Sequence, residues 1–463
     1  MFVNRASELR LLGQRYASEQ AELFVLYGRR RVGKTELLAR FCEGKRHIFY
    51  VADLAAEAVL RSSFSAAVNA LQHGPEAPAP VYGSWEDLLN VLARLAQTER
   101  LVVVLDEFPY LVAAYPPLAS VLQRVWDRAL SKSRIMLILC GSYIGMMEET
   151  VLGYSAPLYG RRTAQYLLEP LEFSDARLFY SNYSLEDRVR AYATFGGTPA
   201  YLKAINPDQS LEANIEQNIL TRGAFLYDEA RFVLQQELRE PRNYFAVLQA
   251  IASGRTQLNE IKQASGLEGV TAYLDTLQQL HLVERVVPVT ETQPHKSRRG
   301  LYRLSDQFLR FWFRFVHPNR SQLEKGASET VLADAVLPFL DLFAGPVFEE
   351  ICRQSFWRAG QGGRLPFSPN QVGGWWRANQ EIDLVAMDDH TALLAECKWS
   401  TRPVGTDILE ALERKAQQAL PELSGRQIYY GLCSRAGFTE HLHQAAAARS
   451  DLLLLEIADL LPD

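Results

Sequence analysis

The chain has 463 residues, of which 48% are hydrophobic and 22% charged, and its formal net charge at pH 7 is -5. This composition is typical of a folded globular protein, and the length predicts about three domains. A negative net charge excludes binding to nucleic acid through the field of the whole molecule. Any contact with DNA or RNA therefore requires a local basic patch.

The cysteines and the apolar segments indicate the cellular compartment. The five cysteines are odd in number, scattered and without a C-x-x-C pair, which argues against a disulfide framework or a structural zinc site. The N-terminus is charged within a few residues, and no apolar run approaches the ~20 residues needed to span a bilayer. We expect a cytoplasmic protein without a membrane partner. The cysteines are Cys42, Cys140, Cys352, Cys397 and Cys433.

Short apolar runs alternate with amphipathic stretches in the first part of the chain. The runs are LFVLY, HIFYV, LVVVLDE, IMLILCG and AQYLL, with helical patterns between most of them. This order predicts a parallel sheet covered by helices. Residues 73–84 lack a usable periodicity and are expected to form a loop. Ser84, followed three residues later by Asp87, predicts the start of a helix after it.

The string GRRRVGKT matches every fixed position of the phosphate-loop pattern G-x-x-x-x-G-K-[ST]. Gly28 and Gly33 lack a Cβ, so the loop can turn its backbone N–H groups toward phosphate oxygens at the start of the next helix. Lys34 is expected to reach the β- and γ-phosphates of ATP, and Thr35 to offer its hydroxyl to Mg²⁺. A plain glycine turn, the alternative, leaves the Lys-Thr pair unexplained. The expected nucleotide-binding residues are Gly28, Arg29, Arg30, Arg31, Val32, Gly33, Lys34 and Thr35.

Polar residues end the next two buried strands. Asp106 is expected to hold Mg²⁺ through water and Glu107 to polarise the attacking water, which implies hydrolysis of ATP. On its own, such a string is more often a buried strand that ends in two surface acids. Ser142 follows the run IMLILCG, where it is placed to sense the γ-phosphate or to form an ordinary Gly-Ser turn.

Two adjacent arginines precede the run AQYLL. Arg161 and Arg162 are candidates to reach transition-state charge, in their own subunit or in a neighbouring one, and a solvated basic turn is the alternative. Together with FVNRASEL at the start and FGGTPAYL at 195–202, these motifs resemble the archaeal and bacterial P-loop ATPases of the AAA+/STAND neighbourhood. The resemblance implies that the N-terminal motif and the G-x-P turn lie near the adenine. The residues concerned are Asn4, Arg5, Gly197 and Pro199.

Residues 243–318 resemble a winged helix-turn-helix, because helical patterns are followed by a β pattern and a basic turn. Gln278 and Gln279 are the only amides near the end of the third helix, so contact with a nucleic-acid backbone is favoured over sequence readout. Packing of one domain against another is an equally open alternative. The aromatic run 308–315 is expected to be buried. The basic residues of the wing are Lys296, Arg298, Arg299 and Arg303.

The C-terminal strings GPVFEE, EIDLVAM and LLAECKW resemble the PD-(D/E)xK nucleases, although Ile382 stands where the family name has proline. Alternation along a strand puts Glu396 and Lys398 on one face, where Asp383 from an adjoining strand and Glu349 from a helix can join them. Clustered carboxylates suit Mg²⁺ or Mn²⁺, with Asp383 and Glu396 as metal ligands. Lys398 would orient the water or offset charge on the phosphate. An exposed strand with alternating Glu and Lys is the alternative.

The expected fold class is α/β: a P-loop NTPase parallel sheet with a helical lid, a winged helix-turn-helix and an α/β restriction-endonuclease-like domain. We expect ATP binding and hydrolysis coupled to nucleic-acid binding or metal-dependent cleavage, with DNA as partner, RNA not excluded and self-association open. One alternative is a STAND-like signalling switch whose C-terminal domain only binds a partner, and another is a transcriptional regulator. The predicted domains are residues 1–172, 173–240, 241–322 and 338–463, with a connector at about 323–337.

Overall fold

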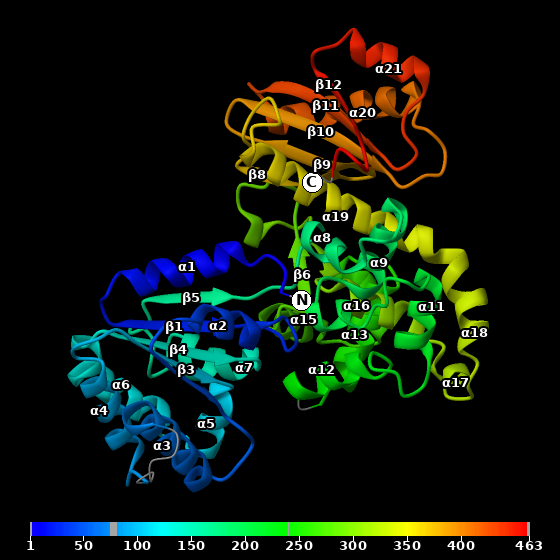
Figure 1. Cartoon of the computed structure of the whole chain (residues 1–463). Coiled ribbons are helices and arrows are strands. Elements are labelled where there is room, and N and C mark those ends of the chain that lie inside the picture. Colours follow the sequence, from blue (N-terminus) through cyan, green and yellow to red (C-terminus); the bar gives the residue numbers. More distant parts are fainter. Residues whose placement is uncertain (1, 75–80, 239, 461–463) are drawn as a thin grey trace. The chain divides into compact units, whose positions relative to one another are not determined.

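The structure is a computed structural model that describes residues 2–74, 81–238 and 240–460 (Figure 1). The chain divides into two compact units, Met1–Pro170 and Leu171–Asp463. Residues 75–80 of the predicted loop lie outside the described part of the chain.

The first unit contains a parallel sheet of five strands in the order β2-β3-β4-β1-β5. This confirms the sheet that the apolar runs predict. Because the carboxyl ends of parallel strands share one edge, the residues that follow β1, β3 and β4 lie close together. The strands are β1 (Glu22–Tyr27), β2 (His47–Val51), β3 (Leu101–Asp106), β4 (Ile135–Gly141) and β5 (Ala164–Leu167).

Helices cover both faces of this sheet because its strands are apolar on both sides (Figure 1). Phe24 and Leu26 pack with α1 and α2, whereas Leu23 and Val25 belong to the core shared with α3, α4, α5 and α6. Ser84 caps α4 by accepting a hydrogen bond from the backbone N of Asp87, as predicted. The helices are α1 (Ala6–Ala17), α2 (Lys34–Cys42), α3 (Glu57–His73), α4 (Trp85–Leu95), α5 (Phe108–Ala114), α6 (Leu118–Arg128), η1 (Leu130–Lys132), α7 (Ile144–Met147) and η2 (Glu148–Leu152).

The second unit begins with short helices, which are followed by the three helices and two strands of the predicted wing region. The strands β6 (Val283–Val286) and β7 (Leu301–Leu304) pair antiparallel. The helices are α8 (Phe173–Ala176), η3 (Arg177–Tyr180), α9 (Leu185–Phe195), α10 (Pro199–Leu202), α11 (Leu211–Ile215), η4 (Glu216–Leu220), α12 (Glu229–Glu237), α13 (Arg242–Ala252), α14 (Leu258–Ser265), α15 (Val270–Gln279) and η5 (Pro294–Lys296).

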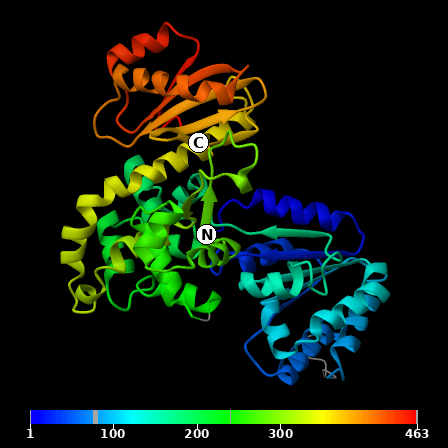
Figure 2. The same cartoon turned by 180° about the vertical axis from the view of Figure 1, so that it is seen from behind.

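The predicted aromatic run forms α16 (Gln307–Phe311) and η6 (Trp312–Val316) and is buried, as expected. The Trp312 indole donates a hydrogen bond to the Tyr227 carbonyl at 2.8 Å. The segment predicted as a connector is helical and leads into α19 (Figure 2). The helices of this part of the chain are α17 (Arg320–Leu323), α18 (Ser328–Val331), η7 (Leu332–Val336), η8 (Leu337–Phe339) and the long helix α19 (Leu340–Gln361).

The helical run Ser328–Gln361 is long and apolar enough to cross a membrane by length and composition alone. Asp334 and Asp341 interrupt its apolar residues, so it contains no continuous apolar run of the predicted kind, and one such helix alone does not indicate a membrane span. The core helix of a soluble protein passes the same test. Asp341, inside this run, pairs with Arg190 at 2.8 Å and with Arg435 at 3.0 Å, contacts that suit such a core helix.

A second five-stranded sheet has the order β12-β11-β10-β9-β8. The pairs β8–β9 and β9–β10 are antiparallel, and β10, β11 and β12 run parallel. α19 covers one face, and α20 and α21 cover the other (Figure 1). The elements are β8 (Gln371–Arg377), β9 (Gln380–Met387), β10 (Thr391–Lys398), α20 (Thr406–Ala419), η9 (Leu420–Leu423), β11 (Gln427–Ser434), α21 (Glu440–Ala447) and β12 (Leu452–Glu456).

Candidate functional site

The phosphate loop connects the end of β1 to the start of α2. Gly28 has a φ of 148°, and a Cβ atom there would lie 2.4 Å from the backbone oxygen of Leu168. Gly33, the N-cap of α2, has a φ of 95°. Both conformations suit glycine and strain other residues. The backbone therefore requires both glycines of the pattern, and the loop ends at the positive end of α2.

Lys34 is the cationic centre of the loop. The side chain is buried, and its Nζ donates hydrogen bonds to the carbonyls of Gly28 at 2.7 Å and Arg29 at 2.8 Å. Burial lowers the pKa of the ammonium, and the negative charges of Glu107 and Asp106 oppose this effect. A phosphate could replace the two carbonyls as the partner of this ammonium.

Thr35 and Asp106 come together although they are 71 positions apart in the chain. The Thr35 hydroxyl donates to Oδ2 of Asp106 at 2.6 Å, and Asp106 is 1% exposed at the end of β3. A hydroxyl and a carboxylate are hard oxygen donors of the kind that Mg²⁺ prefers. The donor set therefore fits the magnesium ion that accompanies ATP.

Glu107 and Ser142 form a second contact between strand ends. Glu107 has a φ of 52°, and its carboxylate accepts hydrogen bonds from the Ser142 hydroxyl and from the Ser142 backbone N, the latter at 3.3 Å. The carboxylate predicted to polarise the attacking water and the serine predicted to sense the γ-phosphate are thus bonded to each other. Ser142 fixes the direction of the Glu107 carboxylate.

Arg30 has aromatic partners that the sequence pattern does not reveal. Its guanidinium donates to the Tyr110 hydroxyl at 2.6 Å and lies 5.7 Å from the centre of the Tyr143 ring. Burial and the hydrogen bond between the Tyr143 and Tyr110 hydroxyls raise the pKa of Tyr143 to about 12. Tyr110 and Tyr143 stand close after Glu107 and Ser142 in the chain. This position is the only feature of the sequence that could have indicated their contact with Arg30. Arg31, at a φ of 69°, is exposed.

Arg5 contacts the backbone of the phosphate loop. Its guanidinium donates to the carbonyls of Val32 at 3.1 Å and Glu169 at 2.8 Å and pairs with Glu8 at 2.9 Å. The N-terminal motif, in which Asn4 and Arg5 both have positive φ, therefore contacts the predicted nucleotide loop. Its contact with adenine stays a prediction.

The two arginines before β5 have partners within the first unit. Arg161 pairs with both carboxylate oxygens of Asp127, at 3.3 and 3.1 Å. Arg162 donates to the carbonyls of Val151 and Leu152 and lies over the Tyr159 ring. These contacts anchor the turn, and a role at the transition state stays a prediction for both residues.

Gly197 and Pro199 belong to the second unit. A Cβ at Gly197 would lie 1.9 Å from the backbone oxygen of Leu171, so only glycine fits this approach. Pro199 is the first residue of α10. The adenine contact that the resemblance implies for these residues stays a prediction.

Asp383, Glu396 and Lys398 come together on the second sheet, as predicted from the spacing. Lys398 Nζ lies 2.5 Å from Glu396 and 3.3 Å from Asp383. Glu396 is 3% exposed, and its other oxygen accepts from Lys415 of α20 at 2.7 Å. Sequence reasoning missed Lys415, because a single lysine in a helix rich in charged residues gives no sign of its partner on the sheet. The two carboxylates raise the pKa of Lys398.

Glu349 lies on α19 in the electrostatic field of this cluster. Burial, followed by the negative charge of Asp383, raises its pKa to about 7. The pKa of Asp383 is also raised, by burial and by Glu396. However, within the described ranges, Glu349, Asp383 and Glu396 do not form a group whose oxygens are all close enough for one ion. The expected three-carboxylate cluster is therefore incomplete among the described residues, and Lys398 bridges Asp383 and Glu396.

The wing region contains both internal and exposed cations. Arg299 donates to the carboxylates of Glu291 at 2.7 Å and Glu422 at 3.3 Å and to the carbonyl of Trp376 at 3.1 Å. For Arg299 this geometry favours the packing alternative. The remaining wing cations are exposed: Lys296, Arg298 and Arg303.

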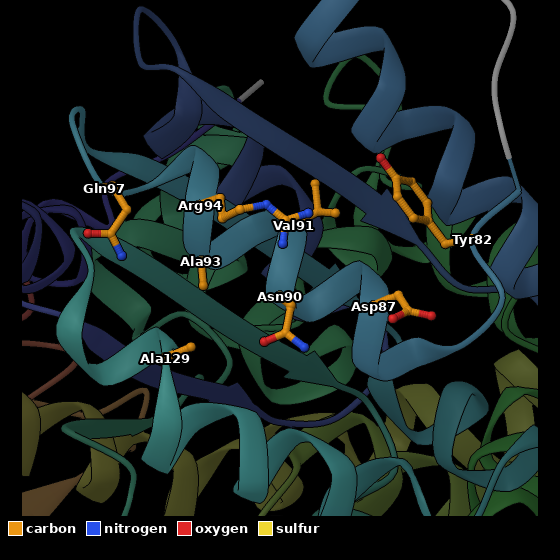
Figure 3. A pocket seen from close by; sticks show the side chains of 8 residues that line it. All are labelled: Tyr82, Asp87, Asn90, Val91, Ala93, Arg94, Gln97 and Ala129. Atoms are coloured by element: carbon orange, nitrogen blue, oxygen red, sulfur yellow. The ribbon is translucent and has the colours of Figure 1, made fainter.

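A surface pocket in the first unit lies along α4 and contains none of the predicted site residues (Figure 3). It is lined by one carboxylate, one guanidinium, one phenol, two amides and apolar side chains, which do not form a recognisable catalytic group. The lining residues are Tyr82, Asp87, Asn90, Val91, Ala93, Arg94, Gln97 and Ala129.

Two family matches cover different parts of the chain. Residues 2–205 match a family described as an ATPase domain predominantly from Archaea. Residues 312–417 match a family described as archaeal and bacterial proteins of unknown function. The first match includes the whole phosphate loop and its Thr35–Asp106 pair, and the second includes α19 and the strands with Asp383, Glu396 and Lys398.

Two proteins of one archaeon and one archaeal structure are similar to this chain. The uncharacterized protein MJECL04 of Methanocaldococcus jannaschii is 34% identical over 407 residues, which cover 86% of this chain and 88% of that protein. The uncharacterized ATP-binding protein MJ0423 of the same organism is 52% identical over 46 residues, 10% of this chain and 78% of that protein. Among solved structures, the Walker-type ATPase PABY2304 of Pyrococcus abyssi is 20% identical with a TM-score of 0.49 over 68% of this chain and 96% of that chain, a likeness too distant to indicate function. The chain belongs to the family of MJECL04 and is an archaeal-type P-loop ATPase.

Proposed function

We propose that this ATPase couples its nucleotide state to metal-dependent cleavage, or to binding, of nucleic acid by the second unit. The observation on which the proposal rests is the convergence of Asp383, Glu396 and Lys398 at neighbouring strand positions, with Glu396 buried. Burying a carboxylate with two lysines costs desolvation free energy that apolar packing would avoid, which favours a functional role for the cluster. The same residue types serve phosphodiester hydrolysis in PD-(D/E)xK nucleases.

In the first unit, each residue of the loop edge has a role in this proposal. The backbone of Gly28–Thr35 and the Lys34 ammonium bind the phosphates, while Thr35 and Asp106 hold Mg²⁺. Bound Mg²⁺ neutralises phosphate charge as it develops. Glu107 accepts a proton from the attacking water, and Ser142 keeps its carboxylate in position. Arg30, held by Tyr110, adds positive potential beside the phosphates.

In the second unit, Asp383 and Glu396 are the residues that would hold a divalent cation. Their oxygens are hard donors. Burial, and after it the negative charge of a neighbouring carboxylate, raises the pKa of both Asp383 and Glu349. A cation of the Mg²⁺ or Mn²⁺ type would supply a Lewis acid for the phosphate and for water. Lys398 would then be released from one carboxylate to contact the scissile phosphate.

DNA is the proposed partner of the second unit. Lys296, Arg298 and Arg303 are exposed near the strands β6 and β7, where they can pair with backbone phosphates. Because such contacts do not depend on base identity, we expect salt-sensitive binding with little sequence preference. The same contacts could bind RNA, so the experiment below includes an RNA substrate.

The decisive experiment is cleavage of labelled linear, single-stranded and branched DNA, and of RNA, with Mg²⁺ or Mn²⁺ and with or without ATP. Lys398→Ala should abolish cleavage while ATP turnover persists. Lys325→Ala, which removes an exposed lysine of the same unit, is the matched control and should cleave normally. Equal cleavage by wild type and Lys398→Ala would remove the nuclease from the proposal.

A STAND-like switch is a second candidate because one observation favours it. Both oxygens of Glu396 are already bonded to lysines, Lys398 and Lys415, an arrangement that also suits a structural site. In a switch, ATP changes the mass of the particle and turnover is slow, whereas a nucleic-acid enzyme is stimulated by DNA. Light scattering with ATP and with ADP, beside ATP turnover with and without DNA, separates the two candidates.

A further inference from the structure

Three of the five cysteines meet inside the second unit. The Sγ atoms of Cys352, Cys397 and Cys433 all lie within 4.8 Å of one another, and all three residues are buried. They are 45 and 36 positions apart in the chain, so spacing in the sequence gives no sign of the group. Cys42 and Cys140 lie in the first unit and do not take part.

The sheet register explains why these thiols converge. Cys397 of β10 and Cys433 of β11 are directly paired in a parallel ladder, so their side chains point to the same face. α19 covers this face, since a Cβ atom at Gly431 would lie 3.8 Å from Cζ of Phe356 on α19. Cys352 lies one helical turn before Phe356 on α19 and supplies the third thiol. Glu396 and Lys398 alternate with Cys397 and therefore point to the opposite face.

The distances suit a metal ion. A metal–sulfur bond is about 2.3 Å long, so three sulfurs around one ion in a plane stand about 4 Å apart. The thiols need to move by less than about 1 Å to reach this spacing. Three rigid elements, one helix and two strands, hold them in advance, and such preorganisation lowers the cost of binding.

We propose that Cys352, Cys397 and Cys433 form a three-sulfur site for a soft, thiophilic cation. Thiolates select ions such as Cu(I) and Zn(II) over Mg²⁺. Among the described residues, no fourth His, Cys or carboxylate joins the group, and Zn(II) in structural sites takes four ligands. The ligand number therefore favours Cu(I). The site lies on the opposite face of the strand from Glu396 and Lys398, and the proposal does not depend on the proposed nuclease.

The test uses the full chain produced in cells grown with added copper or with added zinc and purified under anaerobic, reducing conditions. Metal content per chain identifies the ion, and X-ray absorption at the metal edge counts its sulfur ligands. We expect a stoichiometric ion with three sulfur neighbours in the copper arm. Cys352→Ala should lose at least nine-tenths of the bound metal, whereas Cys42→Ala, which removes another buried thiol, should retain it.

Several results would overturn the site. One is wild-type protein without stoichiometric metal in either arm, and another is an ion with fewer than three sulfur neighbours. Full metal retention in Cys352→Ala would also contradict it. Mass analysis of the unreduced chain after thiol alkylation provides a test that needs no variant, because a disulfide between Cys397 and Cys433 would exclude the three-thiolate site. Metal bound with four sulfur or nitrogen ligands in the zinc arm alone would refute the preference for Cu(I).

Discussion

Glu349 should make the second unit less stable as the pH rises. Its pKa is raised from 4.5 to about 7 in the folded protein, first by burial and then by the charge of Asp383. Glu381 adds to this effect, and the cations Arg303 and Lys398 oppose it. Between these two pKa values the folded protein binds more protons than the unfolded chain. The free energy of unfolding therefore falls as the pH rises from about 4.5 to about 7, and it stays lower at higher pH.

The size of this effect follows from the two pKa values. Each pKa unit corresponds to about 1.4 kcal/mol, so full ionisation of Glu349 costs about 3 kcal/mol of stability. Glu349→Gln keeps the shape of the side chain and removes its ionisation. Without metal, we expect the variant to match wild type near pH 5 and to be more stable by up to about 3 kcal/mol at pH 8. Coupling to Asp383, whose own pKa is raised, will reduce the measured difference.

Urea unfolding followed by tryptophan fluorescence, in EDTA and at several pH values, measures this difference. The first unit is identical in the two proteins, so its pH dependence cancels in the comparison. Added Mn²⁺ should shrink the difference at pH 8 if Asp383 and Glu396 hold the ion, because a nearby cation lowers the pKa of a carboxyl group. An equal change in stability between pH 5 and pH 8 in both proteins would refute the reasoning.

Three further predictions concern the first unit. Lys34→Ala should weaken ATP binding by about 10- to 100-fold, the value of a lost charge-assisted hydrogen bond, and calorimetry showing unchanged affinity would contradict the site. Glu107→Gln should bind ATP normally but lower its turnover by about 10²- to 10⁴-fold, and normal turnover in a phosphate-release assay would exclude Glu107 as the base. Arg5→Ala should destabilise the first unit by about 3–5 kcal/mol, because it leaves the Glu8 charge and two backbone carbonyls without this partner. An unchanged midpoint of unfolding would show that the Arg5 contacts do not stabilise the unit.

The phosphate loop was predictable because its chemistry lies in consecutive residues. Each glycine, the lysine and the threonine occupy fixed positions on one turn between a strand and a helix, so the order of the chain already fixes their geometry. The apolar runs predicted the parallel sheet for a similar reason: a strand buried on both faces needs a continuous apolar string. Asp106 could then be placed near Thr35, since parallel strands end at one edge.

Contacts between distant segments were not predictable from the same strings. Arg30 meets Tyr110, and Arg299 meets Glu422, only after the chain has folded. Arg299 illustrates the consequence: a basic residue in a turn suggests a nucleic-acid ligand until neighbouring carboxylates are found. The cysteines argued against a metal site because their spacing follows no local pattern, and only the pairing of β10 with β11 brings Cys397 beside Cys433.

The two lysines at the candidate sites differ in how firmly the protein holds them. Lys34 is bonded to two neutral carbonyls, which a phosphate with several negative charges can replace at little electrostatic cost. Lys398 is bonded to two carboxylates, and one of these also pairs with Lys415. A scissile phosphate must compete with these charges unless a divalent cation neutralises the carboxylates first. If the second unit acts on a phosphate, as proposed, a divalent cation must neutralise these carboxylates first, whereas the loop can bind ATP phosphates directly. In the proposed coupling, metal binding at the second unit therefore precedes the release of Lys398 toward the nucleic acid.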